Sequence, residues 1–584
     1  MSRPSSAASA RSIWFAATAV ATVLTMFPPP AEPQTLLWSQ QTAKDVQYLH
    51  VTGRGLVLVG TNAETRVMEG ETGRILWSRT DLRDCEPVDA PSNLDYEFKC
   101  DTDGGGLNFV LLPSEPPRLV GHHAPDGRMV IVDVESGKTL FDSATQSLGK
   151  FRRYILSGRG DQVVVAVERK GNTLLVVGIT LADGALGWRF ESTIAEDPIW
   201  VDAAGDALVV LAGKSKRGER VLAAFDTSAG TNVFERTDVL RKEVREAGPR
   251  MVGAQEWRSK AYRIAPLIAD GDSIVAFISK DGPFRLDPQG RVVWRAEDLA
   301  DAEPSRMELQ GGVLYARSDE TVFAIDAATG RTLWRQKARV EPRALAPLAG
   351  VGVLLLTPSR VDLLSLDSGA PVWPRPADIP KVEDARDWNP FSPGLSLGGV
   401  SPLLIRDGAL LVAGGRTLAR VELATGARAD LASYEFKGGE APTLLEARPE
   451  GLLLVAHQNL LSVAPDGTQR FSRFYPAPGE NGWIKLGLGL LSVGAGDPSL
   501  LYETFRIRFR RSAVVESSVY MHVENKEGAA GQQFGLVRLD KRSGEETGML
   551  WHNERRPVVV VDPEVDRVYV RRHGSTLEAY QFPR

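Results

Sequence analysis

The sequence predicts an all-β protein, a β-propeller of about eight four-stranded blades with extra hairpins. Three observations predict this fold. A short strand–turn–strand motif recurs along nearly the whole chain, an aromatic residue recurs at one position of that motif, and the sequence shows almost no helical periodicity.

The clearest copy of the motif is VFAIDAATGRTLW, which covers residues 322–334. It reads as an alternating strand, a tight turn that contains Thr-Gly, and a second short strand that ends in Trp. Ten copies are separated by 39 to 77 residues, and their turn glycines are Gly73, Gly137, Gly184, Gly230, Gly290, Gly330, Gly369, Gly426, Gly467 and Gly544.

The composition of the turn has a physical reason. Glycine tolerates the positive φ that a tight hairpin requires, and a preceding Asp, Ser or Thr can accept hydrogen bonds from the backbone of the turn. A second β-rich stretch precedes most copies, for example Gly352–Leu356. Each unit therefore contains about four short strands, as a propeller blade does.

The fourth residue after the motif glycine is aromatic in most units. It is Phe in three units and Trp in five, namely Trp77, Trp188, Trp294, Trp334 and Trp373. One aromatic ring in each repeat predicts packing between adjacent blades, where a flat ring buries a large area. The alternative, an aromatic cage for a ligand, would place the rings together at one mouth of the channel.

The two ends of the chain complement each other. Residues Ser575–Phe582 resemble the strand before the turn, and Thr35–Trp38 resemble the strand after it. We therefore predict that the N- and C-terminal strands share one blade, which removes open sheet edges.

Counting this composite blade gives eleven units, whereas propellers usually have four to eight blades. We therefore expect one ring of about eight blades in which weaker units between residues 108 and 239 are extra hairpins. Two propellers, one inserted in the other, are the alternative. Interruptions near residues 83–107, 240–262, 374–399 and 502–518 are expected to be excursions from the scaffold.

The overall composition excludes several classes of protein. Charged residues make up 24% of the chain and hydrophobic residues 43%, which is typical of a globular protein and not of a disordered one. The formal net charge of -5 does not fit an electrostatic nucleic-acid binder. Two cysteines and seven histidines leave little material for a metal cluster, and we predict no metal site.

The N-terminus resembles an export signal. Arg3 and Arg11 precede the uncharged apolar run Ile13–Met26, whose 14 residues suit the core of a secretory signal and are few for a bilayer span. We expect residues 1–33 to be a signal peptide and residues 34–584 to be the propeller, in a periplasmic or secreted protein. An uncleaved N-terminal anchor is the alternative, and it would be the only membrane contact.

Cys85 and Cys100 lie 15 positions apart in one acidic stretch. Because exported proteins retain disulfides, we predict a bridge between them. Two unrelated buried thiols are the alternative.

The repeat resembles the pyrroloquinoline-quinone-like, or quinoprotein-type, propeller repeat, whose signature is Ala-x-Asp-x-x-Thr-Gly-x-x-x-Trp. Ala324, Asp326, Thr329, Gly330 and Trp334 match it in full. The resemblance implies the propeller fold but not one function, because the repeat serves quinone enzymes and also cofactor-free scaffolds such as the propeller lipoprotein of the outer-membrane β-barrel assembly machinery. Family dehydrogenases are expected to contain adjacent cysteines. Cys85 and Cys100 are not adjacent, so we predict no cofactor.

The resulting functional hypothesis is an exported, non-enzymatic scaffold that binds other envelope or secreted proteins and no nucleic acid. Arg506, Arg508 and Arg510 alternate along a predicted strand and are candidate partner contacts, although a solvated strand face that discourages edge pairing is the favoured explanation. A quinone-dependent alcohol or sugar dehydrogenase and a propeller that binds glycans or small ligands are the alternatives.

Overall fold

Each repeat folds into one antiparallel sheet in a computed structural model of the chain. The model describes residues 34–52, 54–82, 88–89, 108–112, 116–123, 127–169, 173–240, 268–270, 273–278, 281–300, 302, 306–318, 320–342, 344–382, 403–476, 513–525, 533–554, 558–562 and 564–583. Their strands form eleven sheets, numbered here as blades 1 to 11.

Blades 1 to 4 follow one another along the chain. Blade 1 contains β2 (Val46–Val51), β3 (Leu56–Thr61), β4 (Thr65–Glu69) and β5 (Ile75–Arg79); blade 2 contains β6 (Val88–Asp89), β7 (Asn108–Leu112), β8 (Arg118–His123), β9 (Arg128–Asp133) and β10 (Thr139–Asp142). Blade 3 contains β11 (Lys150–Leu156), β12 (Gln162–Arg169), β13 (Thr173–Thr180) and β14 (Leu186–Ser192); blade 4 contains β15 (Ile194–Ala204), β16 (Leu208–Ser215), β17 (Arg220–Asp226) and β18 (Thr231–Arg236).

Blades 5 to 8 have the same order. Blade 5 contains β19 (Ile268–Asp270), β20 (Ser273–Ile278), β21 (Gly282–Leu286) and β22 (Val292–Arg295); blade 6 contains β23 (Arg306–Gln310), β24 (Val313–Ser318), β25 (Thr321–Asp326) and β26 (Thr332–Lys337). Blade 7 contains β27 (Ala344–Leu348), β28 (Gly352–Leu356), β29 (Arg360–Leu364) and β30 (Ala377–Asp378); blade 8 contains β31 (Leu403–Arg406), β32 (Ala409–Gly414), β33 (Thr417–Glu422) and β34 (Arg428–Ser433).

Blades 9 to 11 complete the set. Blade 9 contains β35 (Leu444–Arg448), β36 (Gly451–Val455), β37 (Asn459–Val463) and β38 (Gln469–Phe474); blade 10 contains β39 (Ala513–Val514), β40 (Ser518–Asn525), β41 (Gln533–Asp540) and β42 (Glu546–Trp551). Blade 11 contains β43 (Val559–Asp562), β44 (Arg567–Arg572), β45 (Thr576–Gln581) and, from the other end of the chain, β1 (Thr35–Gln41). Within the described ranges, helical structure is limited to α2 (Ser143–Gln146) and the 3-10 turns η1 (Glu297–Leu299) and η2 (Lys437–Gly439).

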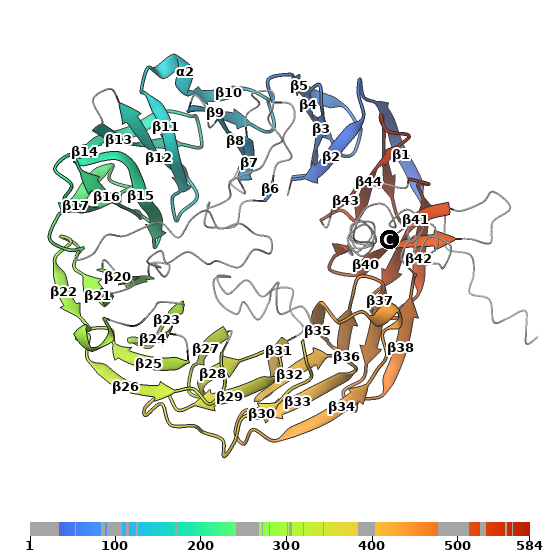
Figure 1. Cartoon of the computed structure of the whole chain (residues 1–584). Helices are drawn as coiled ribbons and strands as arrows, with labels where there is room; N and C mark the ends of the chain where they lie inside the picture. Colours follow the sequence, from blue (N-terminus) through green and yellow to red (C-terminus); the bar gives the residue numbers. More distant parts are fainter. Residues whose placement is uncertain are drawn as a thin grey trace, which may run out of the picture.

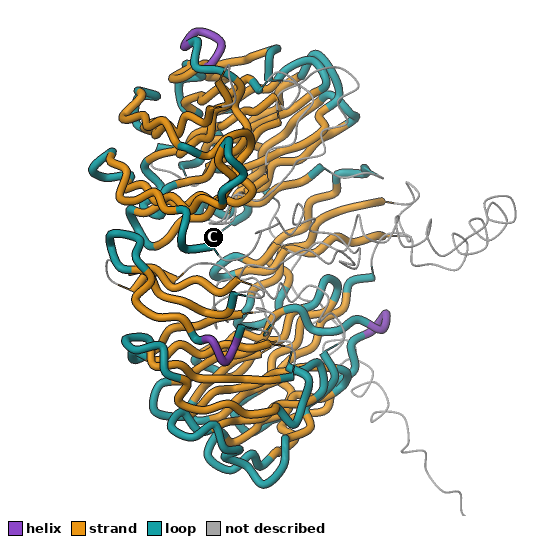
Figure 2. The backbone as a smooth tube through the Cα atoms, turned by 60° about the vertical axis from the view of Figure 1, so that its left-hand side comes forward, coloured by secondary structure: helices purple, strands orange, loops and turns teal. Residues whose placement is uncertain are grey.

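The sheets follow one another around a single ring. Figure 1 shows them in chain order, with the last blade beside the first, and Figure 2 shows the strands of each blade running side by side. Eleven separate hydrophobic cores accompany the eleven blades, and each core joins one blade to the next. The core around Trp38, Val57 and Tyr569 joins blade 11 to blade 1 and so closes the ring.

The expectation of about eight blades is therefore wrong. The units between residues 108 and 239 are complete blades and not extra hairpins, and the described blades form one ring rather than two propellers. The physical reason is that a hairpin alone leaves both of its faces uncovered, whereas a four-stranded sheet between two neighbours buries both. Three of the expected excursions are also partly regular: β6 lies within residues 83–107, β30 within residues 374–399 and β39 within residues 502–518.

The predicted composite blade is confirmed. β1 pairs antiparallel with β45, and the register joins Thr35 to Gln581 and Trp38 to Ala579. The chain ends of the described propeller are thus held together by one strand pair.

A β-bulge recurs where the fourth strand of a blade pairs with the third. In blade 6, Trp334 pairs with Ala324 and Thr332 pairs with Ile325, so that Leu333 is the extra residue. The same irregularity falls on Leu76 in blade 1 and on Val293 in blade 5. A bulge redirects the residues around it. Here it leaves the third residue after the turn glycine unpaired and turns the aromatic fourth residue toward the next blade.

The first prediction concerns ring closure. Truncation after His573 removes β45 and leaves the edges of β44 and β1 unpaired, so we expect aggregation or a marked fall in thermal stability. Size-exclusion chromatography and thermal unfolding measure both effects, and removal of Arg584 alone is the control. A truncated protein that stays monomeric with unchanged stability would contradict the closure.

Candidate functional site

The repeated contact between blades is the most regular feature of the structure. At a typical junction the aromatic ring of one blade lies on the turn glycine of the next, and its indole N–H donates to the carbonyl three residues before that glycine. We call this arrangement the aromatic lock. Between blades 5 and 6, Trp294 Nε1 donates to the carbonyl of Ala327 at 2.9 Å, and a Cβ at Gly330 would lie 2.4 Å from Trp294 Cδ2.

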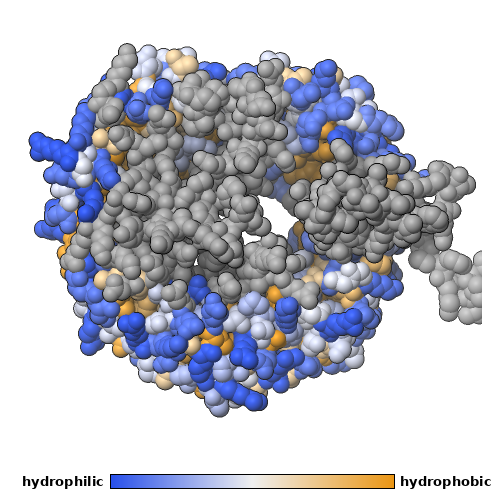
Figure 3. All heavy atoms as spheres, in the orientation of Figure 1, coloured by the Kyte–Doolittle hydropathy of each residue, from blue (hydrophilic) through white to orange (hydrophobic). Residues whose placement is uncertain are grey.

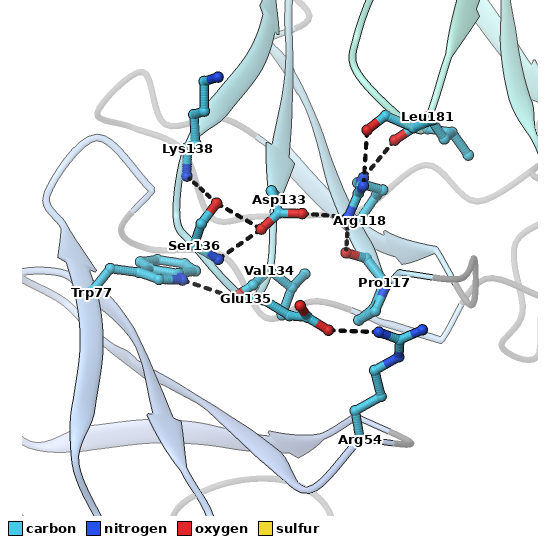
Figure 4. Close-up of polar contacts among 11 residues, drawn as sticks. Arg54, Trp77, Pro117, Arg118, Asp133, Val134, Glu135, Ser136, Lys138 and Leu181 are labelled. Atoms are coloured by element: carbon cyan, nitrogen blue, oxygen red, sulfur yellow. Dashed lines mark hydrogen bonds and ion pairs between the residues drawn. The ribbon is translucent and has the colours of Figure 1, made fainter.

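The lock recurs with the same geometry at four further junctions. The indole N–H groups donate to carbonyl oxygens over 2.7 to 2.9 Å; the pairs are Trp38 with Gly70, Trp77 with Val134, Trp334 with Leu366 and Trp373 with Leu423. Trp294, Trp334 and Trp373 are buried, whereas Trp77 is half-buried. Figure 4 shows Trp77 pointing at the turn of blade 2.

The aspartate of the motif holds the turn in its conformation by accepting hydrogen bonds. Asp326 Oδ1 accepts from the Thr329 hydroxyl at 2.8 Å and from the backbone N–H of Thr329 at 2.7 Å. The Thr329 hydroxyl and these N–H groups hold the pKa of Asp326 below its ordinary value. The Ala-x-Asp-x-x-Thr-Gly signature thus shapes the turn on which the aromatic ring of the preceding blade lies.

Two junctions use other side chains to reach the same carbonyl. Trp188 Nε1 donates to Gln162 Oε1 at 3.0 Å, and Gln162 Nε2 donates to the carbonyl of Thr227 in blade 4 at 2.8 Å. Between blades 2 and 3, Arg118 Nε donates to the carbonyl of Leu181 at 2.5 Å while its guanidinium pairs with Asp133 (Figure 4). The motif did not reveal Arg118 and Gln162, because they lie on inner strands far from the turn in sequence.

Exposed aliphatic residues form a second feature, at the outer edge of three consecutive blades. Val293, Leu333 and Val372 each stand three residues after a motif glycine, and their exposed fractions are 53%, 37% and 40%. Val293 and Leu333 are the bulge residues of blades 5 and 6, whereas Val372 lies between the turn of blade 7 and β30. Val292 beside them is also exposed. We call these four residues the outer apolar row. In Figure 3, hydrophobic colour reaches the outer edge of the ring at the left, where β22 lies in Figure 1.

Basic side chains flank the outer apolar row. Arg291 precedes Val292, and Arg331 and Arg335 lie on either side of Leu333; all three are exposed. Exposed aliphatic side chains in one row, rimmed by charges, are typical of protein contact sites.

The other predicted site residues lie outside the described residues. These are Cys85 and Cys100, and Arg506, Arg508 and Arg510. Their roles stay predictions.

The described part of the chain presents no group of three or more His, Cys, Asp or Glu side chains placed to hold a metal ion. Its repeated Trp side chains lie in the cores between successive blades. No helix within the described residues is long and apolar enough to span a bilayer.

Comparison with known proteins agrees with the repeat geometry. Residues 253–485 match the family model described as "Outer membrane protein assembly factor BamB". The repeats of this part of the chain are similar to the pyrroloquinoline-quinone-like propeller repeat. The matched residues include blades 5 to 9 and with them the outer apolar row.

A curated relative with the same description comes from Burkholderia pseudomallei strain K96243. It is 30% identical over 138 residues, which are 22% of this chain and 36% of that protein. The match thus spans about a third of the relative's length.

Solved structures show weaker likeness. BamB from Moraxella catarrhalis is 13% identical, with 76% of this chain and 100% of that chain covered and a TM-score of 0.28. A eukaryotic initiation factor is 9% identical, with 70% and 92% covered and a TM-score of 0.34. Superpositions of this quality support no argument about the function of the chain.

The second prediction tests the aromatic lock by comparing two glycines. Gly330 and Gly350 both have positive φ, 75° and 68°, but a Cβ at Gly350 meets nothing within 4 Å. Gly350→Ala should therefore cost about 1 kcal/mol for the left-handed conformation alone. Gly330→Ala should cost roughly 1 to 3 kcal/mol more, because its methyl group overlaps Trp294. Chemical denaturation measures the two values, and equal losses of stability would refute the contact.

Proposed function

We propose that this chain is an exported, cofactor-free propeller scaffold that binds other envelope proteins. The similarity of residues 253–485 to an outer-membrane protein assembly factor supports this proposal. The predicted signal at residues 1–33 supports export, which places the protein in the periplasm or outside the cell.

The observation that carries the proposal is the outer apolar row on blades 5, 6 and 7. The buried residues next to the row already have a role, because Trp294, Trp334 and Trp373 form aromatic locks. The residues of the row have no such role within the ring, and each aliphatic side chain gains about 1.5 to 3 kcal/mol when it moves from full exposure to burial. A partner that covers the row would gain part of that free energy at each blade.

A rigid ring suits this use. Neighbouring blades repeat the same geometry, so equivalent positions on successive outer strands are held at fixed spacing by the eleven cores. A surface that does not rearrange on binding loses little conformational entropy. The scaffold therefore offers a preformed contact row instead of a reactive centre.

The third prediction tests this surface. The variant Val293→Asp, Leu333→Asp, Val372→Asp places three charges on the row without touching the buried aromatic rings. Its matched control is Ala424→Asp, Ala427→Asp, Ala429→Asp, which adds the same charge at exposed positions around the turn of blade 8.

Each protein is immobilised, exposed to a detergent-solubilised envelope fraction, and its retained proteins are quantified by mass spectrometry. We expect a set of proteins that the wild type and the control retain equally and that the row variant retains at least about tenfold less, which corresponds to a loss of about 1.4 kcal/mol. Equal retention by all three proteins would contradict the role of the row. If the wild type retains no protein above an empty matrix, the scaffold proposal itself fails.

A further inference from the structure

The junction between blades 10 and 11 differs from the others in its construction. β45 and β1 come from opposite ends of the described chain, so no turn joins the last two strands of blade 11. The turn glycine and carbonyl that would receive an aromatic lock are therefore missing. Blade 10 in turn has Gly548 at the position four residues after Gly544, where most blades have an aromatic ring.

The lock is reversed at this junction. Phe582, which follows β45, is 1% exposed and lies on Gly548, where a Cβ would be 2.1 Å from Phe582 Cδ1. Tyr520 of blade 10 packs against the same ring, with centroids 5.5 Å apart. The aromatic ring thus comes from the receiving blade and the glycine from the preceding one.

Polar contacts replace the indole hydrogen bond. Arg538 NH1 donates to the carbonyl of Pro583 at 3.0 Å, and the same guanidinium pairs with Asp566 in blade 11. The Tyr520 hydroxyl also donates to Asp566. Ionised and hydrogen-bonded groups therefore accompany the reversed aromatic contact at this junction.

A pair of buried histidines lies on the same face of blade 10. Residues i and i+2 of a strand share a face, so His522 lies on the side of β40 that presents Tyr520 to blade 11. His522 and His552 are 7% and 0% exposed, and their ring centroids are 5.9 Å apart. The backbone N–H of Glu554 donates to His552 Nδ1 at 3.1 Å, so a proton added at Nδ1 breaks that hydrogen bond.

The charges around the pair do not favour an added proton. Arg572 of β44 acts on His552 electrostatically, and its own guanidinium is paired with Glu578 of β45. The Glu554 carboxylate accepts from the backbone N–H of His573. Tyr580 of β45 lies on the far side of Arg572, and Glu524 is the next titratable group along β40.

Burial, and then the neighbouring His522 and Arg572, lower the pKa of His552 to about 3 from its ordinary 6.5. Below pH 6.5, His552 binds a proton when the junction is open but not when it is closed. The closed form therefore loses stability relative to the open form as the pH falls from 6.5 toward 3. At pH 5 this difference in the pKa of His552 shifts the equilibrium between the closed and open forms about 30-fold toward the open form.

We propose that the junction between blades 10 and 11 is an acid-sensitive seam of the ring, which opens when the buried pair of His522 and His552 takes up a proton. The remaining junctions hold the other blades in place, so opening is local. It separates blade 11, with both ends of the propeller, from blade 10.

Hydrogen–deuterium exchange of the full chain at pH 7.5 and pH 5, corrected for intrinsic rates, tests this proposal. We expect exchange to rise by about 10- to 30-fold at pH 5 in peptides from residues 546–554 and 567–583, and to stay unchanged in peptides from blades 6 and 7. A uniform rise around the ring, or no rise at the seam, would overturn the proposal.

The variant His552→Asn isolates the titrating group. Its side-chain oxygen can still accept from the N–H of Glu554, as Asn does in turns, but it takes up no proton. We expect the variant to lose the acid response at the seam, whereas His50→Asn in blade 1 keeps it. If His552→Asn does not fold, His522→Asn tests the other member of the pair. An acid response that persists in the folded variant would contradict the assignment.

Discussion

The contact on which the ring depends is an aromatic ring of one blade lying on the turn glycine of the next. It combines burial of a large side chain, typically worth about 3 to 5 kcal/mol when removed, with one hydrogen bond worth about 1 kcal/mol. In blades 1, 5 and 6 a bulge before the aromatic residue aims the ring across the junction, and the absent Cβ at the glycine leaves room for the ring. The sheet, the turn and the neighbouring blade therefore depend on one another. A junction that lacks one of these features is made by other contacts.

Sequence reasoning found the repeat, because its turn glycine and its aromatic residue lie within thirteen consecutive residues, 322–334 in the clearest copy. It predicted that the aromatic rings pack between adjacent blades, but not that each ring meets the turn glycine of the next copy, because that contact joins residues far apart in sequence. It also predicted that β1 completes blade 11, since each terminal strand matches a different half of the motif. The blade number was predicted wrongly, because the usual size range was preferred to the count of eleven units, which are ten motifs and the composite blade. Arg118, Gln162 and the pair of Phe582 and Gly548 could not be predicted, because their contacts join residues far apart in sequence.

The same local rule separates the two faces of each outer strand. One residue is turned inward to hold the ring together, and the residue before it is exposed on blades 5, 6 and 7 and half-buried on blades 1, 2 and 4. On blades 5 to 7 these predecessors are aliphatic, which supports a binding role there. The seam between blades 10 and 11 lacks the aromatic lock, because the last two strands of blade 11 come from opposite ends of the propeller. A reversed aromatic contact and polar groups take the place of the standard lock at this seam, and we propose that it is the junction that responds to acid.

Hydrogen exchange of the indole N–H groups, followed by NMR and assigned by Trp→Phe substitution, tests the aromatic lock most directly. The account predicts that the indole protons of Trp38, Trp77, Trp294, Trp334 and Trp373 exchange at least about 100-fold more slowly than those of a free indole, because each is bonded to a carbonyl of the neighbouring blade. Exchange of these five protons at rates close to those of a free indole would contradict it.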